Sequence, residues 1–168
     1  FRYRFPWLIA TMASGTICAL LTGFYEATLA EAIVLAFFIT LVLALGESVS
    51  IQSMTVALQN LHFGKPNLKD YFRWLRREAS ATLLLGLACG AAVGSIAWVW
   101  RGEPLAALVI GLSVLLSVLA AGIIGMSIPT LLHAIHEDSK IAAGPITLAT
   151  TDILTLVFYF NIATVLLG

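Results

Sequence analysis

Five long apolar runs constrain the fold of this chain more than any other feature of its sequence. They cover residues 6–25, 30–60, 79–100, 104–133 and 141–167. A helix needs roughly 20 apolar residues to cross a bilayer, and each run reaches that length. The runs are continuous, whereas the strands of a transmembrane β-barrel alternate at every second residue. The sequence therefore predicts an all-α integral membrane protein, with one transmembrane domain over residues 1–168 and five transmembrane helices.

Composition agrees with a lipid bilayer as the main partner and excludes several functions. Of the 168 residues, 60% are hydrophobic and 11% are charged. Nine Lys and Arg balance nine Asp and Glu, which leaves no basic surplus for nucleic acid. The two cysteines, Cys18 and Cys89, lie inside apolar runs without metal-ligand spacing. An intramembrane hydrolase is disfavoured, because the chain has no Gly-x-Ser-x-Gly and no His in the interior of a run to act as a base. We expect a protein that is not an enzyme.

The positive charges indicate an orientation. Eight of the nine Lys and Arg residues lie on one side of the predicted spans, and Arg101 lies on the other. The positive-inside rule then places the N-terminus in the cytoplasm and the C-terminus outside, in the cell inner (plasma) membrane. The tryptophans agree, since Trp7 and Trp74 fall at the inner boundary and Trp98 and Trp100 at the outer one.

Residues 67–78, which connect the second and third runs, have the pattern of an amphipathic helix on the cytoplasmic face. The segment begins with Asn67, a good capping residue. Its apolar residues follow at i, i+3, i+4 and i+7: Leu68, Tyr71, Phe72 and Leu75. A calmodulin-binding helix would have the same pattern. The third run itself carries Gly86, Gly90 and Gly94 at every fourth residue, which predicts a close contact with another helix.

Two carboxylates lie in the interior of apolar runs, away from their ends: Glu47 in the second run and Asp152 in the fifth. A charged Asp at the centre of a membrane helix costs about 2.5–3.5 kcal/mol, and no Lys, Arg or His lies in the interior of a run to pair with either acid. At 1.5 Å per residue, Glu47 is about 20 Å and Asp152 about 16 Å from the cytoplasmic ends of their helices. Protons, a cation, or hydrogen bonds to hydroxyl and backbone groups must therefore compensate both acids.

Polar side chains accompany both acids. The pore-lining candidates are Ser48, Gln52, Thr55, Thr151, Thr155 and Tyr159. Oxygen ligands without thiolate or imidazole suit a hard cation such as Mg²⁺, with Mn²⁺ or Ca²⁺ as alternatives. One carboxylate per helix suits a mostly hydrated Mg²⁺, and a homodimer with a central pore would bring four carboxylates together. Alternatively, both acids are protonated or hydrogen-bonded and hold helices together.

A second cluster lies at the cytoplasmic end of the fourth run. It consists of His133, His136, Glu137 and Asp138. These residue types could form a secondary metal or regulatory site. A His near a helix C-terminus can also simply complement the helix dipole, and that alternative stays open.

Several motifs resemble one known family. They are Phe5-Pro-Trp-Leu8, Leu75-Arg-Arg-Glu-Ala79, Val109-Ile-Gly-Leu-Ser-Val-Leu-Leu116, Pro129-Thr-Leu-Leu132, and Asp138 followed by Ala143-Gly-Pro-Ile, Thr151-Asp-Ile-Leu-Thr and Tyr159-Phe-Asn-Ile-Ala163. Together they resemble the transmembrane domain of MgtE-type magnesium channels and transporters, over essentially the whole chain.

The resemblance implies a five-helix protomer that forms a homodimer, with the second and fifth helices lining a Mg²⁺ pathway. The ion-binding aspartate of the family's fifth-helix motif falls on Asp152. Its second-helix motif, usually Gly-Asn followed by Gln, reads here Gly46-Glu47 and then Gln52, so Glu47 replaces Asn. Asn161 stands where the family often has Gly. Family members also carry cytoplasmic regulatory N and CBS domains, which are absent from this chain, so we expect a truncation or a short homologue.

The sequence thus predicts a channel or transporter for a divalent cation, most simply Mg²⁺, with Asp152 and Glu47 as its metal ligands. One alternative is a proton- or sodium-coupled divalent cation exchanger in which Glu47 titrates. Another, of a different class, is a membrane assembly module that transports nothing.

Overall fold

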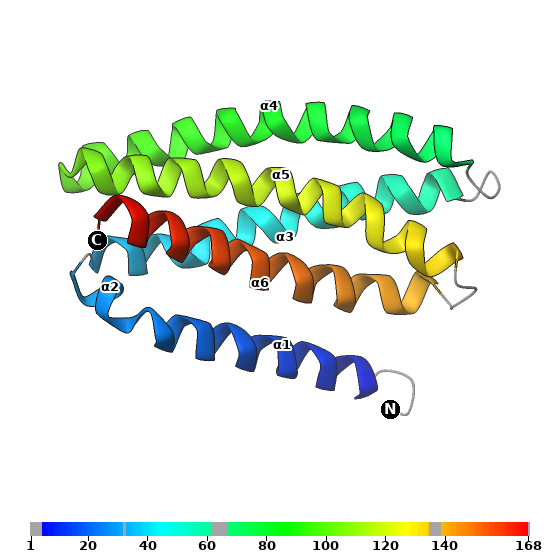
Figure 1. Ribbon diagram of the computed structural model, residues 1–168, viewed down its shortest axis with the longest axis horizontal. Coiled ribbons are helices and arrows are strands. Elements are labelled where there is room, and N and C mark those ends of the chain that lie inside the picture. Colours follow the sequence, from blue (N-terminus) through cyan, green and yellow to red (C-terminus); the bar gives the residue numbers. More distant parts are fainter. Residues whose placement is uncertain (1–4, 32, 62–66, 135–138, 168) are drawn as a thin grey trace.

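The computed structural model describes residues 5–31, 33–61, 67–134 and 139–167, and within these ranges it is all-α, as predicted (Figure 1). Its helices are α1 (Phe5–Phe24), α2 (Glu26–Glu31), α3 (Ile33–Leu61), α4 (Leu68–Arg101), α5 (Pro104–Ala134) and α6 (Ser139–Leu167). Among the described residues, four helices are long and apolar enough to cross a membrane: α3, α4, α5 and the Ala143–Leu167 part of α6. The apolar part of α1, Leu8–Phe24, is shorter.

The long helices lie side by side along one axis, as Figure 1 shows. Helix α5 is central and packs against α3, α4 and α6, while α1 packs on α6 at one edge and α4 forms the opposite edge. Helix α1 begins at one end of the bundle and α6 ends at the other. This arrangement is the one that an odd number of crossings produces.

The core forms where small and branched side chains let α5 approach its neighbours. Ile110, Val114 and Val118 are completely buried along α5. From α6, the Phe160 ring stacks on Tyr25 with ring centroids 4.8 Å apart, and the Tyr159 hydroxyl donates a hydrogen bond of 2.7 Å to the Leu35 carbonyl of α3. These contacts fix α6 against α3 and against the turn between α1 and α2, near one end of the bundle.

Helix α4 differs from the prediction. Residues 67–78 and 79–100 were expected to form a short connector and a separate span, but one uninterrupted helix runs from Leu68 to Arg101. The reason is local, because no Gly or Pro interrupts residues 68–85. The helix ends at Gly102, whose φ of 71° permits the left-handed cap that donates its N–H to the Trp98 carbonyl. At 34 residues α4 is about 51 Å long, well beyond a hydrocarbon layer of about 30 Å.

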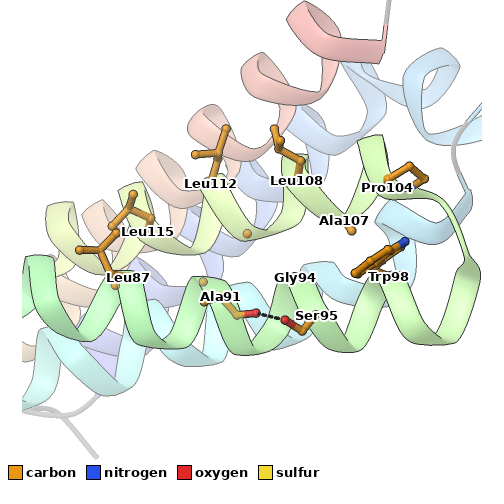
Figure 2. Close-up of a pocket in the computed structure, with 13 residues that line it drawn as sticks. Leu87, Ala91, Gly94, Ser95, Trp98, Pro104, Ala107, Leu108, Leu112 and Leu115 are labelled. Carbon is orange, nitrogen blue, oxygen red and sulfur yellow. Dashed lines mark hydrogen bonds between the residues drawn. The ribbon is translucent and has the colours of Figure 1, made fainter.

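The predicted glycine contact of the third run is present, and its partner is α5. A Cβ placed on Gly90 would lie 2.5 Å from the Gly111 carbonyl oxygen, and one on Gly86 would lie 2.9 Å from the Leu115 carbonyl oxygen. Figure 2 shows the outer side of this contact, where Leu87 and Leu112 border an apolar hollow of about 480 Å³. The two backbones therefore touch, which requires glycine at these positions.

Candidate metal site

Asp152 lies near the middle of α6 and is half-buried. Its carboxylate oxygen Oδ1 is buried and has no hydrogen-bond partner among the described residues. A buried polar atom without a partner costs about 1–3 kcal/mol, and a charged one costs more. The Asp152 carboxylate therefore needs a partner that the described residues do not supply: a proton, a water molecule or a cation.

Glu47 lies at the same level of the bundle on the neighbouring helix α3. The preceding residue, Gly46, packs against α6: a Cβ there would lie 3.1 Å from Thr155 Oγ1 and 3.4 Å from Thr151 Cγ2. Thr151 and Thr155 flank Asp152 in the sequence, so the absence of a side chain at Gly46 lets the two acidic segments approach. Glu47 is close enough to Asp152 for their negative charges to repel each other. A cation between them would remove that repulsion.

The polar residues of α3 divide between two sides of the helix. Glu47 and the pore-lining candidates Ser48, Gln52 and Thr55 are exposed on the surface of the single chain. Gln52 donates a hydrogen bond of 3.3 Å to Ser48, and Thr55 bonds to the Ile51 carbonyl of its own helix. A polar stripe of this kind cannot face lipid tails without a large cost, so it must face protein or water.

The other side of α3 faces the interior of the bundle. Ser50 and Ser53 are buried there. Ser50 donates to the Glu47 carbonyl at 2.9 Å, and Ser53 donates to the Glu78 carboxylate of α4 at 2.5 Å. Ser53 therefore connects α3 to α4, whereas the hydrogen bonds of the exposed stripe stay within α3.

The candidates on α6 also differ from one another. Thr151 and Thr155 are buried beside Gly46, and Thr151 Oγ1 has no hydrogen-bond partner among the described residues. Tyr159 is fully buried, and its hydroxyl is already bonded to the Leu35 carbonyl. The structure thus places Thr151 and Thr155 next to the acids and Tyr159 in the packed core.

Two side chains near this region, Ser14 and Cys18, were not predicted as site residues. Ser14 of α1 donates a hydrogen bond of 3.5 Å to the Ala149 carbonyl of α6, and Cys18, one turn further, lies close enough to Asp152 for electrostatic interaction. Ser117 of α5 is buried with an unpartnered hydroxyl within the described residues. The signal available in the sequence was a small polar residue within an apolar run, which is too common in membrane helices to be decisive.

The predicted secondary site can be placed only in part. His133 is half-buried in the last turn of α5, whereas His136, Glu137 and Asp138 lie outside the described residues. Over the described ranges, no three His, Cys, Asp or Glu side chains come together as a metal site within one chain. A single protomer thus contributes two neighbouring carboxylates, Glu47 and Asp152, to the candidate site.

Comparison with known proteins gives consistent matches. The family model MgtE, described as a divalent cation transporter, matches residues 39–162. Three curated relatives are each described as magnesium transporter MgtE. The protein from Bacillus subtilis is 31% identical over 96% of this chain, that from Enterococcus faecalis 30% over 95%, and that from Thermus thermophilus 29% over 98%. The aligned regions make up 36%, 35% and 36% of those relatives, so the chain spans about a third of their length.

Proposed function

Because the chain belongs to the MgtE family of divalent cation transporters, we propose that it moves a divalent cation, in the first place Mg²⁺, through a pore between two copies of itself. The family is one of membrane transporters and not of enzymes. The observation that carries the proposal is the Asp152 carboxylate, which has a buried, unpartnered oxygen in the middle of a membrane helix and a second acid, Glu47, beside it.

The exposed stripe of α3 supports a homodimer. Glu47, Ser48, Gln52 and Thr55 lie on the surface of the isolated protomer, at a depth where lipid contact is unfavourable. A second copy related by a twofold axis would cover this stripe with its own equivalent and double each acid. Two Asp152 and two Glu47 carboxylates would then surround one narrow path, a cation-selective arrangement.

The chemistry of these ligands favours a hydrated hard cation. Four carboxylates and the neighbouring hydroxyl and amide oxygens offer oxygen ligands only, which suits Mg²⁺ and also admits Mn²⁺ or Ca²⁺. Mg²⁺ dehydrates reluctantly and keeps several waters. In the mechanism we propose, the Asp152 pair attracts the ion, Glu47 adds negative charge, and Ser48, Gln52 and Thr55 hydrogen-bond its water shell.

We also propose an orientation with the N-terminus in the cytoplasm and the C-terminus outside. It rests on the unequal distribution of Lys and Arg. The opposite positions of the start of α1 and the end of α6 are compatible with it. Labelling of single cysteines introduced at either end of the chain, with a reagent that cannot cross the membrane, tests this orientation in intact cells.

Ion flux in proteoliposomes tests the function directly. We expect Mg²⁺ entry with the wild-type chain and a loss of at least about tenfold with Asp152→Asn, which removes the charge but keeps the shape. Asp70→Asn is the matched control, because Asp70 pairs with Arg73 at the exposed end of α4. Undiminished flux in a correctly inserted Asp152→Asn protein would refute the role of Asp152.

One observation favours a second candidate, a proton- or sodium-coupled exchanger: Glu47 is an additional carboxylate in the exposed stripe. Flux measured with and without a pH or sodium gradient distinguishes the two, since a channel follows the Mg²⁺ electrochemical gradient alone. Glu47→Gln would abolish the gradient dependence of an exchanger but leave a channel conducting. An assembly module would show no flux under any of these conditions.

A further inference from the structure

The first turns of α4 carry a cationic face that the proposed pathway does not use. One hollow of about 650 Å³ is lined by Lys69, Phe72, Arg73, Arg76, Arg77 and Ser80. These residues recur at i, i+3, i+4, i+7, i+8 and i+11, so they share one face of the helix. All six are exposed.

This face has an excess of positive charge. Its four cations are Lys69, Arg73, Arg76 and Arg77, and among the described residues the recorded ion pair is that of Arg73 with Asp70, at 3.7 Å. Because these two side chains are 79% and 45% exposed, the pair is weak. Even if it cancels one charge fully, three positive charges remain.

The opposite face of the same turns is fixed to the bundle. The Tyr71 hydroxyl lies 2.9 Å from Ser127 Oγ of α5, and the Glu78 carboxylate accepts a hydrogen bond from Ser53 of α3. One turn further on, Thr82 packs against Gly122 of α5. Glu78 is thus turned away from the cations, and the backbone that carries them is held in place before any ligand binds. Such preorganisation lowers the entropic cost of binding.

The position along α4 places two of the four cations, Arg76 and Arg77, at lipid headgroups. The apolar residues 79–100 span about 33 Å, close to the thickness of the hydrocarbon layer. Arg77 and Arg76 then lie about 3–5 Å beyond its edge, among the headgroups, whereas Arg73 and Lys69 lie about 9 Å and about 15 Å beyond it. Phe72, on the same face of the helix as Arg76, is 64% exposed, and an aromatic side chain suits the membrane interface.

From this geometry we propose that the cationic face of α4 binds the phosphate group of an anionic phospholipid in the adjacent leaflet, with Arg76 and Arg77 as its main ligands. Guanidinium groups bind phosphate oxygens in pairs, and juxtamembrane cations are attracted to anionic lipids. The proposal rests on the chain spanning a bilayer and not on its proposed transport function, so binding can be tested without any measurement of flux.

The experiment measures lipid preference around Trp74, which lies on this stretch of α4. In a chain with Trp7, Trp98 and Trp100 replaced by Phe, quenching by brominated phosphatidylglycerol is compared with quenching by brominated phosphatidylcholine in mixed vesicles. We expect a clear preference for phosphatidylglycerol. Since a cation near an anionic surface contributes about fivefold to binding, Arg76→Gln with Arg77→Gln should reduce that preference about 25-fold.

Two controls sharpen this result. Arg101→Gln, which removes the cation at the other end of α4, should leave the preference unchanged, and Arg76→Lys with Arg77→Lys should keep most of it. Equal quenching by the two lipids in the protein that keeps Arg76 and Arg77 would overturn the proposal. That comparison needs no substitution at the site. Displacement of the lipid by millimolar inorganic phosphate, or preference for a poly-glutamate peptide over the lipid, would overturn it as well.

Discussion

Glycine has a different role in two helix contacts of this bundle, the one between α4 and α5 and the one between α3 and α6. In the glycine contact between α4 and α5, a Cβ on Gly90 would meet backbone, 2.5 Å from the Gly111 carbonyl oxygen. In the polar contact between α3 and α6, a Cβ on Gly46 would meet side chains, the hydroxyl of Thr155 and the methyl group of Thr151. The first contact joins two backbones, and the second brings two acidic segments together.

We infer that the glycine contact mainly stabilises the bundle, whereas the polar contact serves function. Lipid tails are as apolar as the helices, so helices in a membrane associate through close van der Waals packing, and the glycine contact maximises it. The polar contact instead carries an unpartnered oxygen of Asp152 and the repulsion between Asp152 and Glu47, both of which lower stability. A bundle retains such a contact where it gains a ligand, which is why we place transport there.

The largest effect on stability is expected at the glycine contact. Gly90→Ala should lower the free energy of unfolding by up to about 3 kcal/mol, because backbone atoms of α5 cannot give way as a flexible side chain can. Gly15→Ala in α1 is the matched control, since a Cβ there meets nothing within 4 Å, and it should stabilise the helix by about 0.5–1 kcal/mol. Unfolding of the purified proteins in detergent measures both, and an equally stable Gly90→Ala protein would contradict the distinction between the contacts.

An intermediate effect on stability is expected at the polar contact. Gly46→Ala requires Thr155 to move by a few tenths of an ångström, and we expect a loss of about 1 kcal/mol. Mg²⁺ flux should nevertheless fall several-fold, because Thr151 and Thr155 flank Asp152. A Gly46→Ala protein that loses stability but conducts like the wild type would show that this contact is structural only.

The smallest effect is expected for Tyr159→Phe. This change removes the hydrogen bond to the Leu35 carbonyl, and interhelical hydrogen bonds in membranes contribute about 0.6 kcal/mol on average. Flux should stay within about twofold of the wild type, since the Tyr159 hydroxyl is already engaged inside the protomer. A large loss of flux at unchanged stability would instead support the pore-lining role predicted from the sequence.

The helical class and the approximate bounds of the long helices could be predicted from the sequence, because hydrophobicity over 20 residues decides them. The continuity of α4 across residues 67–100 was missed, since a polar stretch and an apolar stretch read as two elements even when no residue breaks the helix. The exposure of Phe72 could not be predicted either, because it depends on tertiary contacts. It matches Tyr71 in hydrophobic pattern, yet Tyr71 contacts Ser127 and Phe72 is exposed.

The two acids of the candidate site could be predicted from the sequence, but the direction in which each polar residue of α3 faces could not. Glu47 and Asp152 stand out because charge inside a membrane helix is costly. Which polar residues of α3 face the bundle could not be read from spacing: Ser50 and Ser53 are buried, whereas Ser48 and Gln52 are exposed. The side of α3 that faces the bundle and the side on the protomer's surface are both polar, so helical periodicity cannot separate them.

The most direct test of the central claim is anomalous diffraction from crystals of the protein soaked in Mn²⁺, which serves as a stand-in for Mg²⁺. We predict a dimer with a Mn²⁺ peak on its axis, between the Asp152 carboxylates of the two protomers and next to the two Glu47 side chains. A dimer with Asp152 hydrogen-bonded to protein and no peak between the acids would contradict the account.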